Sequence, residues 1–276
     1  MKMVRHVLAR VLFYAGSSIF AAIFALPMIW LLTAPFSSRA NLSVEWPDPF
    51  TMANFVRIFD NTFAVRALFQ NSIIQAGGTM LAVTLIATLA AYALSRAPIR
   101  GRDALSYGLV LFSSIVTGTA AMVPLFLMIF NLGLIDTQIG VILVFTGGFL
   151  PAAIFIMRDF VDSIPRSYEE SAIVAGASPF GMFRDIALPI VRPGMMVVGV
   201  WTFVNVWGSF FVPFILLRSP VNMPASVAIY SFYTEGGTPI ITLTTAYALL
   251  YTLPVLGLYL FVNWRYGFRF FGGIKS

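Results

Sequence analysis

Uncharged apolar blocks alternate with shorter polar segments along the whole chain. Six of these blocks lie near residues 11–35, 72–95, 104–130, 138–157, 193–217 and 241–264, and none of them contains Asp, Glu, Lys, Arg or His. An α-helix needs about 20 predominantly apolar residues to cross the hydrocarbon core of a bilayer. The pattern therefore predicts an all-α membrane protein, with six transmembrane helices forming a single domain over residues 1–276.

The polar segment 163–190 is the longest interruption between apolar blocks in the second half of the chain. Ser167 precedes Glu170 by three residues, which is the spacing of a capping box at a helix N-terminus. We expect a helix from about Tyr168 to Ala175. Gly176 then stands where a helix end favours a residue that tolerates positive φ.

A second helix is predicted after this glycine. Ser178 can cap its N-terminus, and Pro179 fits the first helical position because its missing N–H group needs no partner there. The helix is expected to end at Pro189, since a proline disfavours the α conformation of the residue before it. The segment thus reads as a helix-turn-helix close to the membrane.

Composition supports a membrane protein and restricts its chemistry. Hydrophobic residues make up 59% of the chain and charged residues 10%, with a mean hydropathy of +0.89, which is unlike a soluble protein. The absence of cysteine excludes disulfides, thiolate metal sites and cysteine nucleophiles. The single histidine, His6, lies in the leader before the first block. A membrane-embedded enzyme is therefore a poor interpretation.

The basic residues predict the orientation of the spans. With the N-terminus inside, the same side receives thirteen of the 17 basic residues, namely Lys2, Arg5, Arg10, Arg96, Arg100, Arg102, Arg158, Arg166, Arg184, Arg192, Arg265, Arg269 and Lys275. Because cytoplasmic loops carry an excess of Lys and Arg, both termini and segment 163–190 are expected in the cytoplasm. The net charge of +6 then reflects topology and anionic lipid rather than a nucleic-acid partner.

The same segment resembles a known motif. Glu170-Ser171-Ala172, Gly176 after three further residues, and Ile186-Ala187-Leu188-Pro189 after nine more are similar to the EAA loop of bacterial ABC-importer permeases. Ser171 departs from that motif at its second position, and Ala175 stands where sugar permeases often have Asp. The resemblance implies that the segment is a coupling loop and that its contacts with an ATPase involve Glu169, Glu170, Ser171, Ala172, Gly176, Ala177, Ile186, Leu188 and Pro189.

The resemblance extends over nearly the whole chain and implies a carbohydrate-uptake importer, similar to the smaller permease of the maltose type. It implies a heterodimer with a second homologous permease, two cytoplasmic ATPase subunits and an extracytoplasmic solute-binding protein, in a bacterial cytoplasmic membrane. ATP and Mg would be used by the ATPase partners. The chain itself has no phosphate-binding loop ending in Gly-Lys-Ser/Thr, so we expect no enzymatic activity, metal or cofactor in it.

The fifth block carries the candidate substrate path. At 100° per residue, Trp201, Asn205 and Ser209 share one helix face, and Trp207 lies nearby. Sugar permeases often have a Trp-Asn-acidic-Phe arrangement here, of which Trp207-Gly208-Ser209-Phe210 keeps only the Trp and the Phe. Helix packing by polar residues, with Trp at the membrane interface, is the alternative interpretation.

An ion-coupled secondary transporter of a small neutral solute is the alternative function. Such transporters commonly use a titratable or ion-coordinating group at mid-membrane. The six blocks hold no such titratable group, although a sodium site could still be built from carbonyls and hydroxyls. Uncharged spans also favour a neutral solute, and we expect a sugar or a sugar-derived compound.

Overall fold

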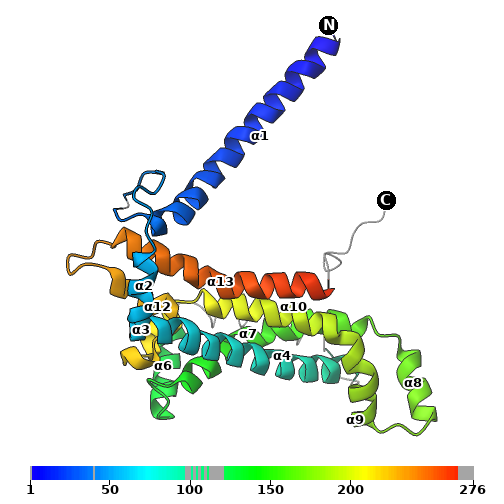
Figure 1. Ribbon diagram of the computed structural model, residues 1–276. Helices are drawn as coiled ribbons and strands as arrows, with labels where there is room; N and C mark the ends of the chain where they lie inside the picture. Colours follow the sequence, from blue (N-terminus) through cyan, green and yellow to red (C-terminus); the bar gives the residue numbers. More distant parts are fainter. Residues whose placement is uncertain are drawn as a thin grey trace. The chain divides into compact units, whose positions relative to one another are not determined.

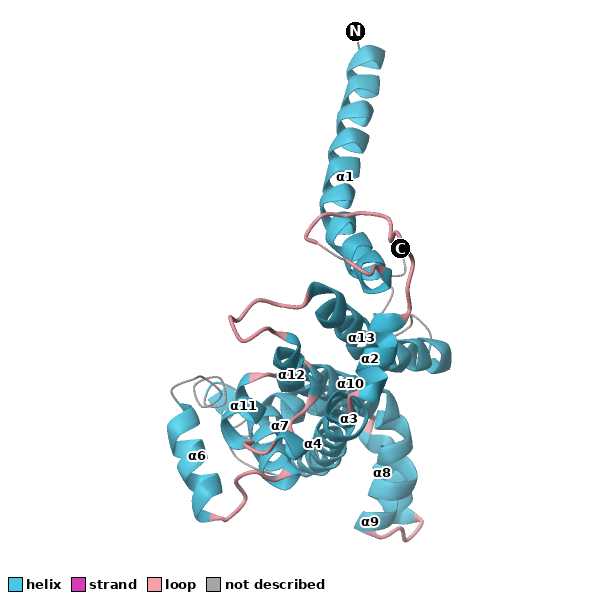
Figure 2. Ribbon diagram, turned by 60° about the vertical axis from the view of Figure 1, so that its left-hand side comes forward, coloured by secondary structure: helices cyan, strands magenta, loops and turns pink. Residues whose placement is uncertain are grey.

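The computed structural model describes residues 2–39, 41–96, 101, 104, 107, 108, 111 and 121–266. Within these ranges every regular element is a helix, and Figure 2 shows only helices and loops. Extended pairing among the same residues is limited to two isolated bridges, Ser37 with Phe50 and Tyr233 with Pro239. The prediction of an all-helical protein is thus confirmed for the described part of the chain.

Long helices alternate with short helical segments along the chain (Figure 1). In order they are α1 (Lys2–Thr33), η1 (Ala34–Phe36), α2 (Ala53–Asp60), α3 (Thr62–Arg66), η2 (Ala67–Asn71), α4 (Ser72–Arg96), α6 (Met122–Asn131), α7 (Gln138–Asp162), α8 (Arg166–Val174), α9 (Pro179–Met182), η4 (Phe183–Ala187), α10 (Leu188–Trp207), α11 (Phe211–Leu216), η5 (Pro220–Asn222), α12 (Ala225–Ala228), η6 (Ile229–Phe232) and α13 (Ile241–Tyr266). Two of the short segments, η2 and η4, are π-helical.

Among the described residues, five helical segments are long and apolar enough to cross a membrane. They are Arg10–Phe36, Thr62–Arg96, Gln138–Asp162, Pro179–Trp207 and Ile241–Trp264. About half of the third expected block, 104–130, lies outside the described residues, including the stretch 112–120, and α6 lies at the end of the block. That the chain has six spans therefore stays a prediction.

The fifth expected span, 193–217, differs from the structure at both ends. Helical structure begins before residue 193, and α10 ends at Trp207 with Gly208 as its C-cap. Gly208 to Phe210 interrupt the helix, and α11 begins at Phe211. A continuous apolar sequence conceals this break, because hydropathy does not register the helix-ending glycine.

The chain forms two compact units. The first consists of Met1–Val65 with Ile229–Pro254. Within it, Asn54 of α2 donates to the carbonyls of Pro35 and Ser37 at 2.8 and 2.9 Å. Tyr247 of α13 donates through its hydroxyl to the Ala64 carbonyl at 3.3 Å. These bonds satisfy buried polar groups of helix-joining segments. The expectation of a single domain stays a prediction.

The second unit, Arg66–Ala228 with Val255–Ser276, contains α4, α7 and α10, which pack against one another. Their shared core is a cluster of buried side chains, comprising Val83, Ala87, Ala91, Ala153, Met157, Val161, Ile164, Ala187, Val191 and Val198. The small residues among them let helix backbones approach closely, which is how membrane helices associate. The segment from α8 to η4 extends from one end of this bundle (Figure 1).

At the opposite end of α7, polar contacts hold the segment that follows α11. Asp136 has φ +60°. Its carboxylate accepts hydrogen bonds from the backbone N–H groups of Arg218 and Ser219, each at 3.0 Å, and from the Ser219 hydroxyl. Burial by itself raises the pKa of Asp136, but hydrogen bonds from Ser219, Arg218 and Asn222 outweigh it and lower the pKa.

Two amide side chains hold the same segment from the side of η2 and α4. Asn71 donates to the carbonyls of Val221 and Met223 at 2.8 and 2.9 Å. Gln75 donates to the Gln138 side chain at 2.7 Å. The start of α4, the start of α7 and residues 218–223 are therefore joined by buried or half-buried hydrogen bonds, each of which is stronger where water is excluded.

Candidate functional site

The turn between α8 and α9 has the hydrogen bonds of a Schellman motif. The N–H group of Gly176 donates to the Ile173 carbonyl and that of Ala177 to the Ala172 carbonyl, both at 2.9 Å. Gly176 has φ +83°, a conformation in which a Cβ is disfavoured. The prediction that Gly176 ends the first helix at positive φ is confirmed.

The N-cap predicted for the second helix is also confirmed. Ser178 has extended backbone angles (φ −73°, ψ 156°), and its hydroxyl accepts from the Gly181 N–H group at 3.1 Å. Pro179 occupies the first turn. Turn and cap together define the direction in which the chain re-enters the bundle.

The predicted capping box is wrong. Helix α8 begins at Arg166, with Pro165 as its N-cap and no side-chain cap. Ser167 lies inside the first turn, where its carbonyl accepts from the Ser171 hydroxyl at 2.7 Å. Because Pro165 takes φ −59° and ψ 129°, it ends the preceding turn and lets the helix start before the serine.

The predicted helix end at Pro189 is wrong as well. After α9 the chain continues through the π-helical η4 directly into α10. In η4 the Leu188 N–H group donates to the Phe183 carbonyl, five residues earlier. The α register restarts at Leu188, so Pro189 falls in the first turn of α10, where its missing N–H group needs no partner.

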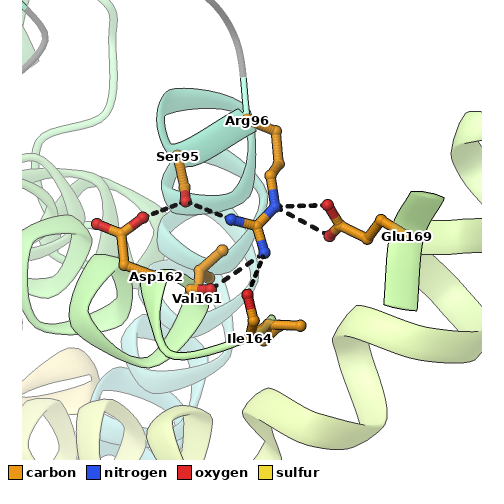
Figure 3. Close-up of polar contacts among 6 residues, drawn as sticks. All are labelled: Ser95, Arg96, Val161, Asp162, Ile164 and Glu169. Carbon is orange, nitrogen blue, oxygen red and sulfur yellow. Dashed lines mark hydrogen bonds and ion pairs between the residues drawn. The ribbon is translucent and has the colours of Figure 1, made fainter. Parts of the chain in front are cut away.

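Helix α8 is tied to the bundle by Arg96, the last residue of α4 (Figure 3). The Nε atom of Arg96 lies 2.7 Å from Oε2 and 2.9 Å from Oε1 of Glu169. One guanidinium nitrogen donates to the Ser95 hydroxyl at 3.1 Å, and the other donates to the carbonyls of Val161 and Ile164 at 3.3 and 3.2 Å. A guanidinium at a helix C-terminus also interacts favourably with the helix dipole.

A second carboxylate extends this network along α7. The Ser95 hydroxyl donates to Asp162, and Nε of Arg158 lies 3.3 Å from the other oxygen of the Asp162 carboxylate. The side chains of Arg96 and Glu169 are only 16% and 11% exposed. An ion pair that is shielded in this way is screened far less by salt than a surface pair.

Several large apolar side chains of the α8–α9 segment are exposed. Val174 is 90% exposed, Phe180 is 70% exposed, and Tyr168 and Ile173 are more than half exposed. Several large exposed apolar side chains on one short segment are typical of a protein–protein contact. A partner could bury them.

The residues predicted to couple to an ATPase are divided between surface and interior. Glu170, Ser171, Gly176, Ala177 and Pro189 are exposed, Ala172, Ile186 and Leu188 are half-buried, and Glu169 is buried. Glu169 therefore faces this chain's own Arg96, whereas its neighbour Glu170 stays at the surface. Ala187, which lies between Ile186 and Leu188, is 1% exposed and belongs to the core cluster.

The predicted substrate path is only partly brought together. Trp201 packs edge-on against Phe149 of α7 with ring centroids 5.2 Å apart, and Asn205 donates to the Trp201 carbonyl at 2.7 Å. Trp207 is buried and stacks on Phe203 at 5.4 Å. Ser209 lies beyond the end of α10, so the helical spacing that would place it on the face of Asn205 does not apply.

Ser209 instead borders a cavity of about 410 Å³ that the sequence did not indicate. The described residues around it come from α6, α7 and α11 and are nearly all apolar, with Met122, Phe145 and Phe149 among them. Such a cavity favours apolar contact over polar recognition.

Residues 94–267, more than half of the chain, match the family described as binding-protein-dependent transport system inner membrane component. The chain belongs to this family. It is therefore a multi-pass membrane protein and a transport component.

Curated relatives of this permease match most of its length. The maltodextrin transport system permease protein MdxG of Bacillus subtilis (strain 168) is 28% identical over 92% of the chain and 93% of the relative. The diacetylchitobiose uptake system permease protein NgcG of Streptomyces coelicolor is 30% identical over 71% of the chain and 65% of the relative.

The fold of the permease also matches a solved structure. A chain in the crystal structure of a bacterial ABC transporter involved in the import of the acidic polysaccharide alginate superposes with a TM-score of 0.80 at 21% identity. The match covers 94% of the permease and 96% of that chain. At this identity the likeness supports the fold.

Sequence reasoning missed Arg96, because it is 73 residues from Glu169. Its only local signal is its place as the first basic residue after an apolar block. A basic residue there, together with two adjacent glutamates at the start of a later polar helix, would be the pattern to search for in a related permease.

Proposed function

We propose that this permease is one of two pore-forming subunits of an ATP-driven importer. It would pair with a second, homologous six-span permease and bind two cytoplasmic ATPase subunits through segment 163–190. A solute-binding protein outside the cytoplasm would deliver the solute, and transport would proceed by alternating access. ATP and Mg would be bound by the ATPase subunits.

The observation that carries this proposal is the shape and surface of the α8–α9 segment. It extends from the bundle, exposes Val174 and Phe180, and is held by Gly176 and Ser178 in one backbone conformation. A preorganised segment with exposed apolar side chains loses little conformational entropy when a partner binds it. Basic residues around this segment favour a cytoplasmic position, where an ATPase would meet it.

We propose a neutral sugar or oligosaccharide as the solute. The names of two relatives, which refer to maltodextrin and diacetylchitobiose, support a carbohydrate. The six apolar blocks contain no charged residue that would attract an anionic solute. Trp201, Asn205, Trp207 and Ser209 remain proposed path residues, and Ser209 borders the apolar cavity.

The test is reconstitution. The tagged permease is purified from its host in mild detergent, and co-purifying subunits are identified by mass spectrometry and by ATPase activity. The complex is then placed in liposomes with ATP inside and binding protein with labelled oligosaccharides outside. We expect uptake that requires ATP and the binding protein. Uptake without ATP, driven by a sodium or proton gradient, would instead establish an ion-coupled carrier.

A further inference from the structure

The guanidinium of Arg96 lies where three helices meet. Arg96 ends α4, the carbonyls of Val161 and Ile164 lie at the end of α7 and just beyond it, and Glu169 lies in the first turn of α8. One planar group therefore contacts all three helices at once (Figure 3).

We propose that Arg96 is a positioning residue that makes α8 move as one body with α4 and α7. The inference deepens the proposed function and rests on it, since α8 is the first helix of the segment proposed to bind the ATPase. Without Arg96, α8 would lose its bonds to the ends of α4 and α7, and residues 163–165 would remain as its covalent connection to α7. Movement of the ATPase would then shift α8 without an equal movement of the spans.

Only arginine suits this position. The guanidinium has five N–H donors in a fixed plane, so it can bind a carboxylate on one edge while other donors bind carbonyl groups. Lysine can approach Glu169 as a single charge, but it cannot direct donors to Glu169, Ser95 and the end of α7 together. Substitution of Arg96 by lysine therefore separates the effect of the positive charge from the effect of the guanidinium geometry.

A second contact ties the other half of the segment to the same part of α4. Tyr92 lies one helical turn before Arg96, and its ring packs against that of Phe183 in η4 with centroids 5.1 Å apart. Arg96 holds α8, and Tyr92 contacts the helix that follows the turn. The last two turns of α4 thereby contact the segment 163–190 on both sides of its turn, at α8 and at η4.

The two adjacent glutamates take different roles under this proposal. Glu169 is buried against Arg96 and serves as the anchor within the chain. Glu170 is exposed at the surface and remains available to a partner. Replacement of the first glutamate should change how movement is transmitted, and replacement of the second should change how a partner binds.

The experiment uses the complete transporter and the fact that the permease has no cysteine. Spin labels are attached at Ser167→Cys on α8 and at the exposed position Leu85→Cys on α4, with the partner subunits made cysteine-free. Distances are measured by double electron–electron resonance with and without ATP. Solute imported per ATP hydrolysed is measured in liposomes. The variants are Arg96→Met, Arg96→Lys and Glu169→Gln, with Arg192→Met as the control for loss of an exposed cytoplasmic charge.

We expect one narrow distance distribution that is the same with and without ATP in the unsubstituted protein and in Arg192→Met. Arg96→Met should broaden it and lower the solute imported per ATP several-fold, because the substitution removes the ion pair with Glu169 and the hydrogen bonds to Ser95, Val161 and Ile164. Arg96→Lys and Glu169→Gln should give smaller decreases. A merely stabilising role would lower the amount of folded complex and leave both readouts unchanged.

Unchanged distances and unchanged coupling in the assembled Arg96→Met transporter would overturn the proposal. If that variant does not fold, Arg96→Lys and Glu169→Gln decide in the same way, because each keeps a polar side chain at its position. Failure of the proposed function is recognised separately. In that case the unsubstituted complex would show no ATP-dependent import, while the label distances would still report whether Arg96 holds α8.

Discussion

Gly194 of α10 lies so close to Phe160 of α7 that a Cβ atom on the glycine would be 2.5 Å from the phenylalanine Cγ. Real side chains do not tolerate such a distance, and the aromatic ring is held within the packed bundle. The contact shows why α10 and α7 can approach each other at this level only if one of them carries no side chain.

Gly194→Ala should therefore destabilise the permease by about 1–3 kcal/mol, the usual effect of overpacking. The measurement is the thermal unfolding midpoint in detergent. Gly77→Ala in α4 is the matched control, since no atom lies within 4 Å of a Cβ built there. Recovery of the midpoint in Gly194→Ala with Phe160→Ala, which removes Cγ and the ring, would identify this side chain as the cause. An unaltered midpoint in Gly194→Ala alone would contradict the prediction.

Gly176→Val should leave the permease inserted in the membrane but impair transport. A β-branched residue at φ +83° costs roughly 1–2 kcal/mol or more, so the turn would open or shift. The measurement compares membrane expression with ATP-dependent uptake. Gly176→Asn is the control, because asparagine tolerates this conformation and should retain most activity. Normal uptake by Gly176→Val at normal expression would count against a rigid turn.

Ser178→Ala should loosen the start of α9. The alanine cannot accept from the Gly181 N–H group, and loss of such a cap costs about 1 kcal/mol. Hydrogen–deuterium exchange at the Gly181 amide should be accelerated, whereas Ser178→Asp should keep the amide protected because a carboxylate can accept the same bond. Equal exchange rates in the two variants would show that the cap does not hold this turn.

Asp136 should make the stability of the permease sensitive to acid. Its pKa is lowered in the folded protein from the usual 3.8, so folding favours the ionised carboxylate. The stability that this provides is complete above about pH 3.8 and is lost as the pH falls below it through the folded pKa. Unfolding midpoints should decrease over this range, and Asp136→Asn should show a smaller decrease. Identical acid profiles for the two proteins would exclude Asp136 as the cause.

Local features of the fold were predictable from the sequence because their causes are local. Gly176 and Ser178 form their turn and cap from neighbouring backbone groups, and both were placed correctly. Apolar runs likewise matched helices among the described residues, apart from the break in the fifth run at Gly208 to Phe210. The start of α8 was misplaced by two residues because Pro165, rather than the hydroxyl of Ser167, decides it.

The remaining features depend on contacts that no local pattern records. The ion pair of Arg96 with Glu169 joins two helices that are distant in sequence. At the other end of α7, the hydrogen bonds from Arg218 and Ser219 to the Asp136 carboxylate join two segments that are also distant in sequence. The interruption of the fifth span at Gly208 is also invisible to hydropathy. For the candidate site, sequence reasoning identified the exposed segment and missed what anchors it.

The π-helical turn η4 adds a residue between α9 and α10 and so bears on the directions in which the two helices face. It contains one more residue per turn than an α-helix would, and each residue of an α-helix corresponds to a rotation of about 100°. The five residues of Phe183–Ala187 therefore complete about the same rotation as four residues of an α-helix, so α9 and α10 face nearly as they would in an uninterrupted α-helix. The extra residue is absorbed within η4, and a permease one residue shorter there, with α geometry throughout, would present the side chains of α9 in nearly the same direction.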